Sequence, residues 1–159
     1  MGISASDLCQ HVIRPTLLYM ERHSASAEAL LLGAAASQSA LGSELSQHNG
    51  HGIYCISEQR HQQLWDHYLA RDPDLASLVR GLASQRAFLT APHLELIVNL
   101  RYATAIAWLL IEAEQVVLPP ANDLPGLARI WRQVFQPQSQ LRDFLRAWQQ
   151  FVAPQLRAA

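Results

Sequence analysis

The chain contains no lysine. Its twelve basic residues are all arginine, its acidic residues number thirteen, and its formal net charge is −1. A nearly neutral chain offers no electrostatic basis for binding DNA, RNA or an anionic membrane surface. We therefore expect no nucleic-acid partner.

Cysteine is scarce as well, with only Cys9 and Cys55 in 159 residues. Two isolated thiols imply neither a disulfide framework nor a zinc site. Cys55 could be interpreted as a nucleophile that works with one of three histidines, His48, His51 or His61. A catalytic cysteine needs a lowered pKa and an oriented histidine, and the sequence shows neither feature.

Several motifs of known chemistry are also missing. The chain has no glycine-rich phosphate loop, no HExxH zinc motif and no GxSxG nucleophile motif. Metal binding requires three or four convergent ligands, and the histidine spacing gives no diagnostic pattern, although His48 and His51 form HxxH and His61 and His67 follow. We expect neither a metal nor another cofactor.

No targeting or membrane segment is predicted. The N-terminal stretch MGISASDLCQ lacks the basic start and the apolar core of a secretory signal, so we expect no signal peptide. The most hydrophobic stretch, residues 94–111, contains Glu95, Asn99 and Arg101. Charged and amide groups are costly inside a bilayer, and a helix that runs through a protein core is the better interpretation.

What the chain does have is the composition of one globular domain, residues 1–159, with half of its residues hydrophobic and 16% charged. Its apolar periodicity and capping residues predict a mainly α-helical fold. Ser24 or Ser26 should cap a helix to about Ser39, Ser57 should cap another, and Pro73 should begin the next. The expected helices lie near residues 7–13, 24–39, 57–69, 73–82, 92–114, 124–135 and 141–156. Residues 52–56 are the one good candidate for a small strand or hairpin.

Two segments carry a resemblance to a known family. The stretch LLLGAAASQSALG ends a hydrophobic helix, and GIYCIS follows fourteen residues later. This pairing resembles the lysozyme-like domain of soluble lytic transglycosylases, in the variant found in phage virion proteins. In that family the helix ends in Glu-Ser, and a Gly-Leu-aromatic-Gln strand lines the sugar groove. The resemblance covers roughly residues 5–115 and leaves the two C-terminal amphipathic helices, residues 120–159, outside it.

The resemblance implies that the catalytic acid has been lost. Gln38 occupies the glutamate position, beside Ser39, and Cys55 occupies the strand glutamine position, next to Tyr54. Glycoside cleavage needs a carboxylic acid to protonate the leaving oxygen, and an amide has no such proton. Loss of general acid catalysis typically lowers the rate by about 10²–10⁴-fold. We therefore expect a degenerate groove and no catalytic residue.

The functional expectation that follows is a phage or prophage virion structural or internal protein that acts through assembly contacts. It would lie in the virion, or in the bacterial cytoplasm during assembly, and bind other virion proteins or itself. Two alternatives stay open. The chain could be an active peptidoglycan-cleaving enzyme that uses another carboxylate such as Glu44, or a non-catalytic module that binds peptidoglycan glycan.

The C-terminal helices suggest where a partner would bind. Trp131, Phe135, Phe144 and Trp148 are residue types that anchor interfaces, and Arg142 and Arg146 could pair with carboxylates of a partner. The same aromatic side chains could instead complete the domain's own core.

The resemblance also predicts a geometry. Gln38 should lie at the C-terminal end of its helix and face a cleft floored by residues 52–56. Its amide should lie near Tyr54 or Cys55, and a continuous helix over residues 94–112 should run beneath as the buried central element.

Overall fold

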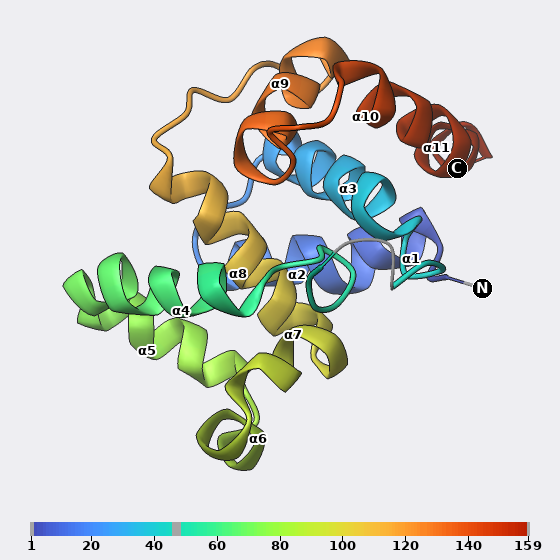
Figure 1. The fold of residues 1–159 in the computed structure, drawn as a ribbon. Helices are drawn as coiled ribbons and strands as arrows, with labels where there is room; N and C mark the ends of the chain where they lie inside the picture. The colour runs from blue at the N-terminus through green and yellow to red at the C-terminus, as the bar shows by residue number, and fades with distance from the viewer. Residues whose placement is uncertain (1, 46–48, 159) are drawn as a thin grey trace.

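The computed structural model describes residues 2–45 and 49–158, and this part of the chain is mainly α-helical, as the sequence predicts (Figure 1). Buried side chains from both ends of the chain join in one hydrophobic core. The elements, in chain order, are α1 (Ala5–Leu8), η1 (Cys9–Ile13), α2 (Arg14–Tyr19), α3 (Ala25–Ser39), α4 (Glu58–His67), η2 (Leu69–Arg71), α5 (Pro73–Leu82), α6 (Gln85–Thr90), η3 (Pro92–Leu94), α7 (Glu95–Val98), α8 (Leu100–Ala113), α9 (Leu124–Val134), α10 (Leu141–Ala147), η4 (Trp148–Val152) and α11 (Ala153–Ala158).

Local sequence explains where most of these helices begin. The hydroxyls of Ser24 and Ser57 accept hydrogen bonds from the backbone of the first turns of α3 and α4, and Pro73 is the first residue of α5. The first helix begins earlier than the sequence suggested, because Ser4 caps it. These starts follow from residue chemistry and need no tertiary contact.

Two π-helical turns, η1 and η4, each lie just before a proline. Arg14 precedes Pro15 and donates its N–H to the carbonyl of Cys9, five residues back. Ala153 precedes Pro154 and bonds in the same way to Trp148. A proline ring clashes with the carbonyl four residues before it, and a widened turn relieves that clash. Both helices therefore continue through their prolines.

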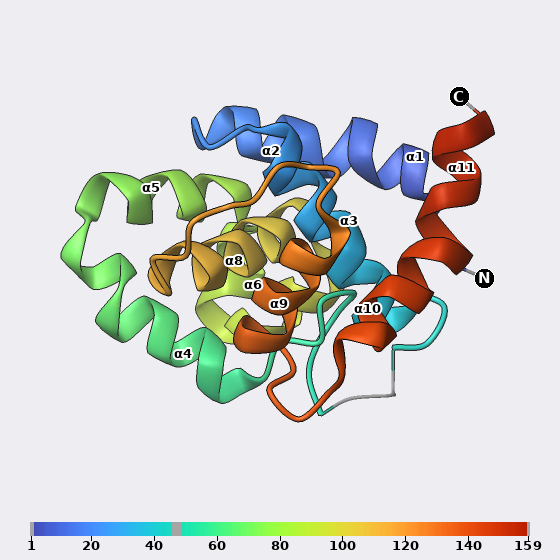
Figure 2. The same cartoon turned by 90° about the horizontal axis from the view of Figure 1, so that it is seen from above.

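Helix α8 lies in the middle of the molecule in two perpendicular views (Figures 1 and 2). On one side of it α3 is covered by α9, α10 and η4, and on the other side α4 to α7 form a second group. Helix α3 is buried around nearly its whole circumference, which explains its small residues. The ring of Phe144 lies directly on Gly33, where an added Cβ would be 2.1 Å from the phenyl Cζ.

The prediction of a continuous helix over residues 94–112 is wrong, because the helix is interrupted at Asn99. The helical segments before and after this residue, 92–98 and 100–113, are bent by 107°. The Asn99 side chain caps α8 by accepting from the Tyr102 N–H at 3.0 Å, and it donates to the carbonyl of Leu82 at 2.7 Å and to Glu95 Oε2 at 2.8 Å. The buried central element is therefore α8 alone. Among the described residues, no single helix is long and apolar enough to cross a membrane, and only this bent pair reaches the required length and composition.

The segment predicted as a small strand or hairpin takes a minimal hairpin form. His51 and Ile56 make one antiparallel bridge, with N–H to carbonyl distances of 2.8 and 3.2 Å. Gly52 has φ of +77°, and a Cβ there would lie 1.8 Å from the carbonyl oxygen of Leu96. Cys55 also has a positive φ. The segment turns tightly and does not extend as a strand, and its Gly52 packs directly onto the backbone of α7 at Leu96.

The aromatic residues of the C-terminal helices complete the domain's own core, which is the second of the two alternatives that the sequence left open, and they form no exposed docking face. Trp131, Phe135, Phe144 and Trp148 are each at most 8% exposed. Phe144 lies between the two indole rings, 5.8 Å from Trp131 and 6.3 Å from Trp148 by ring centroids. These aromatic residues are buried because α9, α10 and η4 pack over α3, whose side chains are mostly small. Arg142 and Arg146 point outward and are exposed.

Candidate functional site

The end of α3 meets the 52–56 turn as the sequence predicts. Gln38 is the second-last residue of α3, and its Nε2 donates to the carbonyl of Tyr54 at 3.2 Å. The Ser39 hydroxyl donates to the carbonyl of Ile53 at 2.7 Å, and the Cys55 thiol donates back to the carbonyl of Gln38 at 3.2 Å. Three side chains therefore hold the helix end and the turn together.

Among the described residues, the cleft predicted at Gln38 is closed. Gln38 is 1% exposed, Ser39 and Tyr54 are fully buried, and the described cavities are lined by none of them. Within the described part of the chain, Gln38 Oε1 has no hydrogen-bond partner. The groove is closed here because the turn packs down onto α3, so the amide faces backbone rather than solvent.

Tyr54 points into the core and not toward a groove. Its hydroxyl lies 2.9 Å from Thr104 Oγ1, and Thr104 in turn donates to the carbonyl of Leu100 at 2.8 Å. The Tyr54 hydroxyl is therefore the donor in the first of these bonds. Burial raises the pKa of Tyr54, which keeps that proton in place. The residue ties the turn to α8.

Glu44, the fallback acid, lies on a different face. It is exposed, and it lines a cavity of about 220 Å³ against α10 together with Asp143 and Arg146. A general acid for glycoside cleavage needs an apolar enclosure that favours its protonated form. The exposed position of Glu44, away from Tyr54 and Cys55, does not provide one.

Neither cysteine is arranged as a nucleophile. Burial raises the pKa of the Cys55 thiol to about 11, the opposite of what activation requires. Burial and the hydrogen bond to Glu28 raise the pKa of Cys9 to about 12. His48, one of the suggested partners of Cys55, lies outside the described residues, and neither His51 nor His61 bonds to the thiol in the described part.

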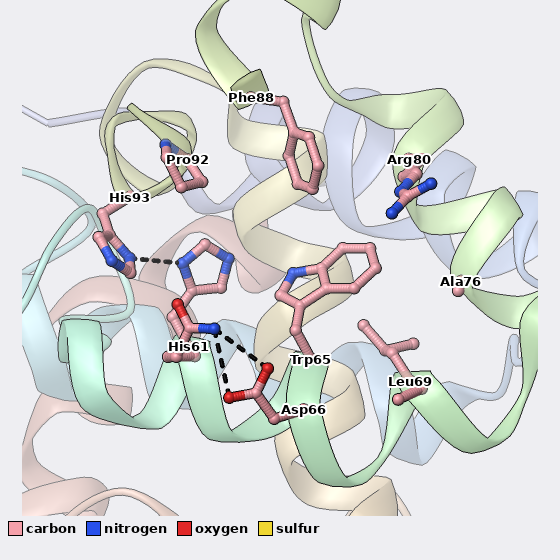
Figure 3. Close-up of a pocket in the computed structure, with 11 residues that line it drawn as sticks. His61, Trp65, Asp66, Leu69, Ala76, Arg80, Phe88, Pro92 and His93 are labelled. Atoms are coloured by element: carbon pink, nitrogen blue, oxygen red, sulfur yellow. Dashed lines mark hydrogen bonds between the residues drawn. The ribbon is translucent and has the colours of Figure 1, made fainter. Parts of the chain in front are cut away.

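Sequence reasoning missed a cavity of about 380 Å³ between α4, α5, α6 and η3 (Figure 3). Trp65 and Phe88 meet edge to face in its wall, with centroids 5.4 Å apart, and the Arg80 guanidinium lies 5.8 Å from both rings. The further lining includes the hydrogen-bonded pair Gln62 and Asp66. The only signal in the sequence was the spacing of residues 61, 62, 65, 66 and 69, which places them on neighbouring faces of one helix.

Two histidines close one side of this cavity. The Nδ1 atoms of His61 and His93 lie 2.9 Å apart, and His61 Nε2 lies 2.7 Å from the hydroxyl of Tyr102. Trp65 donates its indole N–H to the same hydroxyl at 3.0 Å. Burial, followed by the nearby His93 and His51, lowers the pKa of His61 to about 4, so its ring is neutral near pH 7.

The histidines do not converge as metal ligands would. His51 stacks on His93 with ring centroids 6.4 Å apart, and its Nε2 lies 3.2 Å from Glu58 Oε1. Among the described residues, no group of three or more histidine, cysteine or acidic side chains is arranged to hold a metal ion.

Comparison of the chain with protein-family models, with curated proteins and with solved structures finds no match.

Proposed function

We propose that this chain is a non-catalytic, lysozyme-like helical domain that serves as a structural or internal protein of a phage or prophage particle. The observation that supports the loss of catalysis is the state of Gln38. Its amide is buried and bonded to the backbone of Tyr54, at the position that the resemblance assigns to the acid. The virion role comes from the resemblance of residues 30–57 to phage virion proteins.

The local chemistry agrees with this proposal. Gln38 Nε2 already donates to a carbonyl, and the residues around it are buried. A sugar oxygen could reach this amide only if the 52–56 turn moved away from α3. The contact acts as a structural link between two segments rather than as a ligand-binding group.

A turnover assay tests the catalytic half of the proposal. Purified protein should release no soluble muropeptide from peptidoglycan, and Glu44→Gln should leave that result unchanged. Turnover in the wild type that disappears in Glu44→Gln would establish an active enzyme instead. Turnover that persists in Glu44→Gln would assign catalysis to another carboxylate and would equally contradict the proposal.

Particle composition tests the assembly half. The protein should be present, by mass spectrometry, in particles purified from a producing host. Because Arg142 and Arg146 are exposed, reversing both charges with Arg142→Glu and Arg146→Glu should reduce incorporation without lowering thermal stability. Arg157→Glu, an exposed arginine on α11, is the matched control. Absence of the protein from particles would refute the assembly role.

One observation favours a second candidate, a glycan-binding module. The cavity beside Trp65 has the volume usual for ligand sites, and it combines aromatic rings with the polar pair Gln62 and Asp66. Calorimetric titration with muropeptide fragments tests this candidate. Binding that is lost in Trp65→Leu would support it, and absence of binding at millimolar ligand would exclude it.

A further inference from the structure

The contact between His61 and His93 joins α4 to the segment of α6 and η3, which also meets α4 through the rings of Phe88 and Trp65. His61 belongs to α4, and His93 lies in η3, thirty-two residues later (Figure 3). Their two Nδ1 atoms are 2.9 Å apart. A hydrogen bond between two imidazole nitrogens requires one to carry a proton and the other to carry none.

The neighbours of His61 determine where that proton lies. Tyr102 accepts the indole N–H of Trp65, and burial raises the pKa of Tyr102, so its hydroxyl proton remains. If every donor has an acceptor, the Tyr102 hydroxyl donates its hydrogen bond to His61 Nε2, 2.7 Å away. A neutral His61 then carries its own proton on Nδ1 and donates it to His93. The result is a directed chain from Trp65 through Tyr102 and His61 to His93.

Protonation of both rings breaks the bond between them. A first added proton can be accommodated, because a protonated His61 still donates from Nδ1 and the Tyr102 oxygen can accept from Nε2. When both rings are protonated, each Nδ1 carries a proton, and two N–H groups face each other across 2.9 Å. A hydrogen bond is then replaced by repulsion between two charged donors.

The charged and titratable groups around the pair make no direct bond to either imidazole that would hold an added proton, apart from Tyr102. Those packed near it are His51 from the turn, Glu58 and Asp66 from α4, Arg80 from α5, Glu95 from α7 and Tyr102 from α8. Glu58 faces His51, Asp66 accepts from Gln62, and Glu95 accepts from Asn99 through Oε2, while its Oε1 has no partner among the described residues. No carboxylate among the described residues bonds to His61 or His93.

The segment on the His93 side is weakly anchored. Neither α6 nor η3 contains a buried residue. Two of its large apolar side chains, Leu89 and Leu94, are exposed, and Phe88 is the one that packs against Trp65 and Tyr102. Few buried apolar contacts mean a low free energy of local opening, so one hydrogen bond contributes a large share of what holds this segment.

We propose that the His61–His93 contact is an acid-sensitive latch that holds the segment of α6 and η3 against α4, and that protonation of the pair releases this segment. Release would widen the cavity beside Trp65 and expose the side of Phe88 that now faces it. This inference does not depend on the proposed virion role.

Hydrogen exchange tests the latch. Exchange rates of backbone amides are measured near pH 7.5 and near pH 5 and divided by the intrinsic rate at each pH. Protection of residues 85–94 should fall about tenfold on acidification, while protection of α3 stays within about twofold. Equal loss of protection in both regions would show global unfolding and would refute a local latch.

Two variants sharpen the result. His93→Asn keeps an acceptor for the His61 N–H but does not titrate, so residues 85–94 should stay protected at pH 5. His67→Asn is the matched control, because His67 is an exposed histidine on the same helix outside the chain of bonds, and it should behave like the wild type. A wild-type response in His93→Asn would overturn the proposal.

Imidazole resonances of the wild type decide the question if His93→Asn does not fold. The latch requires that protonation of both the His61 and His93 rings be accompanied by loss of protection at residues 85–94. Resonances that show both rings protonated while residues 85–94 keep their protection would refute it.

Discussion

Gly33 of α3 packs against Phe144 of α10, whose ring occupies the space where a side chain at position 33 would lie. We predict that Gly33→Ala lowers the free energy of unfolding by about 1–3 kcal/mol, the usual result of overpacking a filled core. Urea denaturation measures this change.

A double-mutant cycle separates this clash from the helix propensity of alanine. Phe144→Leu removes the ring atoms that the new methyl group would meet, so Gly33→Ala should cost less in the Phe144→Leu background than in the wild type. Strictly additive effects would mean that the methyl group is accommodated elsewhere.

The buried position of Gln38 accepts a neutral side chain but not a charged one. Gln38→Glu would place a carboxyl group against the carbonyl of Tyr54, in a position that is 1% exposed. The protonated acid can donate there and the carboxylate cannot, so the folded-state pKa of the new glutamate should lie above its unfolded value of about 4.3.

The sign of the pH dependence follows directly. Relative to the wild type, Gln38→Glu should lose stability as pH rises above about 4.3, and the loss should level off above the folded-state pKa. Denaturation curves near pH 5 and pH 8 measure this difference, with Gln138→Glu, at an exposed loop site, as the control. An equal loss at both pH values would show that the site admits water.

At the scale of elements, Asn99 produces the sharp bend before α8. We predict that Asn99→Ala lowers the free energy of unfolding by about 1–3 kcal/mol, because it removes the cap on Tyr102 and the bond to the Leu82 carbonyl. Thermal denaturation measures the change. Asn122→Ala, at an exposed turn, should have little effect.

Asn99→Asp separates the two roles of this residue. An aspartate keeps the capping oxygen but loses both donors, and it places a second carboxylate beside Glu95. It should therefore be more stabilised by mild acid than Asn99→Ala. Identical behaviour of the two variants would assign the whole effect to the lost donors and none of it to the cap.

For the whole molecule, the free energy of unfolding at acid pH should depend on two buried groups, the basic side chain of His61 and the acidic side chain of Glu28. His61 is neutral in the fold, with a pKa lowered to about 4 by burial and by His93 and His51. Its unfolded value is about 6.5, so its stabilising effect is complete above that pH and is lost as pH falls toward 4. The loss should be at most about 3 kcal/mol. Unfolding free energies across this range should decline less steeply in His61→Gln.

Glu28 acts in a lower range of pH. Its pKa is lowered to about 2, because the hydrogen bonds from Arg14, Cys9 and His23 outweigh the opposing effect of burial. Its contribution is therefore complete above the unfolded value of about 4.5 and is lost as pH falls through about 2. Glu28→Gln should remove this lower part of the acid transition and leave the His61 part intact. Loss of both parts together would contradict the assignment.

The sequence alone determined the helical class and many helix starts, because hydroxyl caps, prolines and apolar spacing act within a few residues. Ser24, Ser57 and Pro73 mark helix starts where local chemistry predicts them. The pattern around Gln38 and Tyr54 correctly predicted that the end of one helix contacts the 52–56 segment. These features depend on contacts close in sequence or on a strong pairwise pattern.

The tertiary structure decided which side chains meet solvent. It buried Gln38, turned the C-terminal aromatic residues inward, and bent the chain at Asn99 through a bond to Leu82 seventeen residues away. It also joined His61 to His93 across thirty-two residues. Composition and periodicity give the direction of an apolar face but not the element that covers it. That outcome depends on how all the helices pack around α8, which no local spacing encodes.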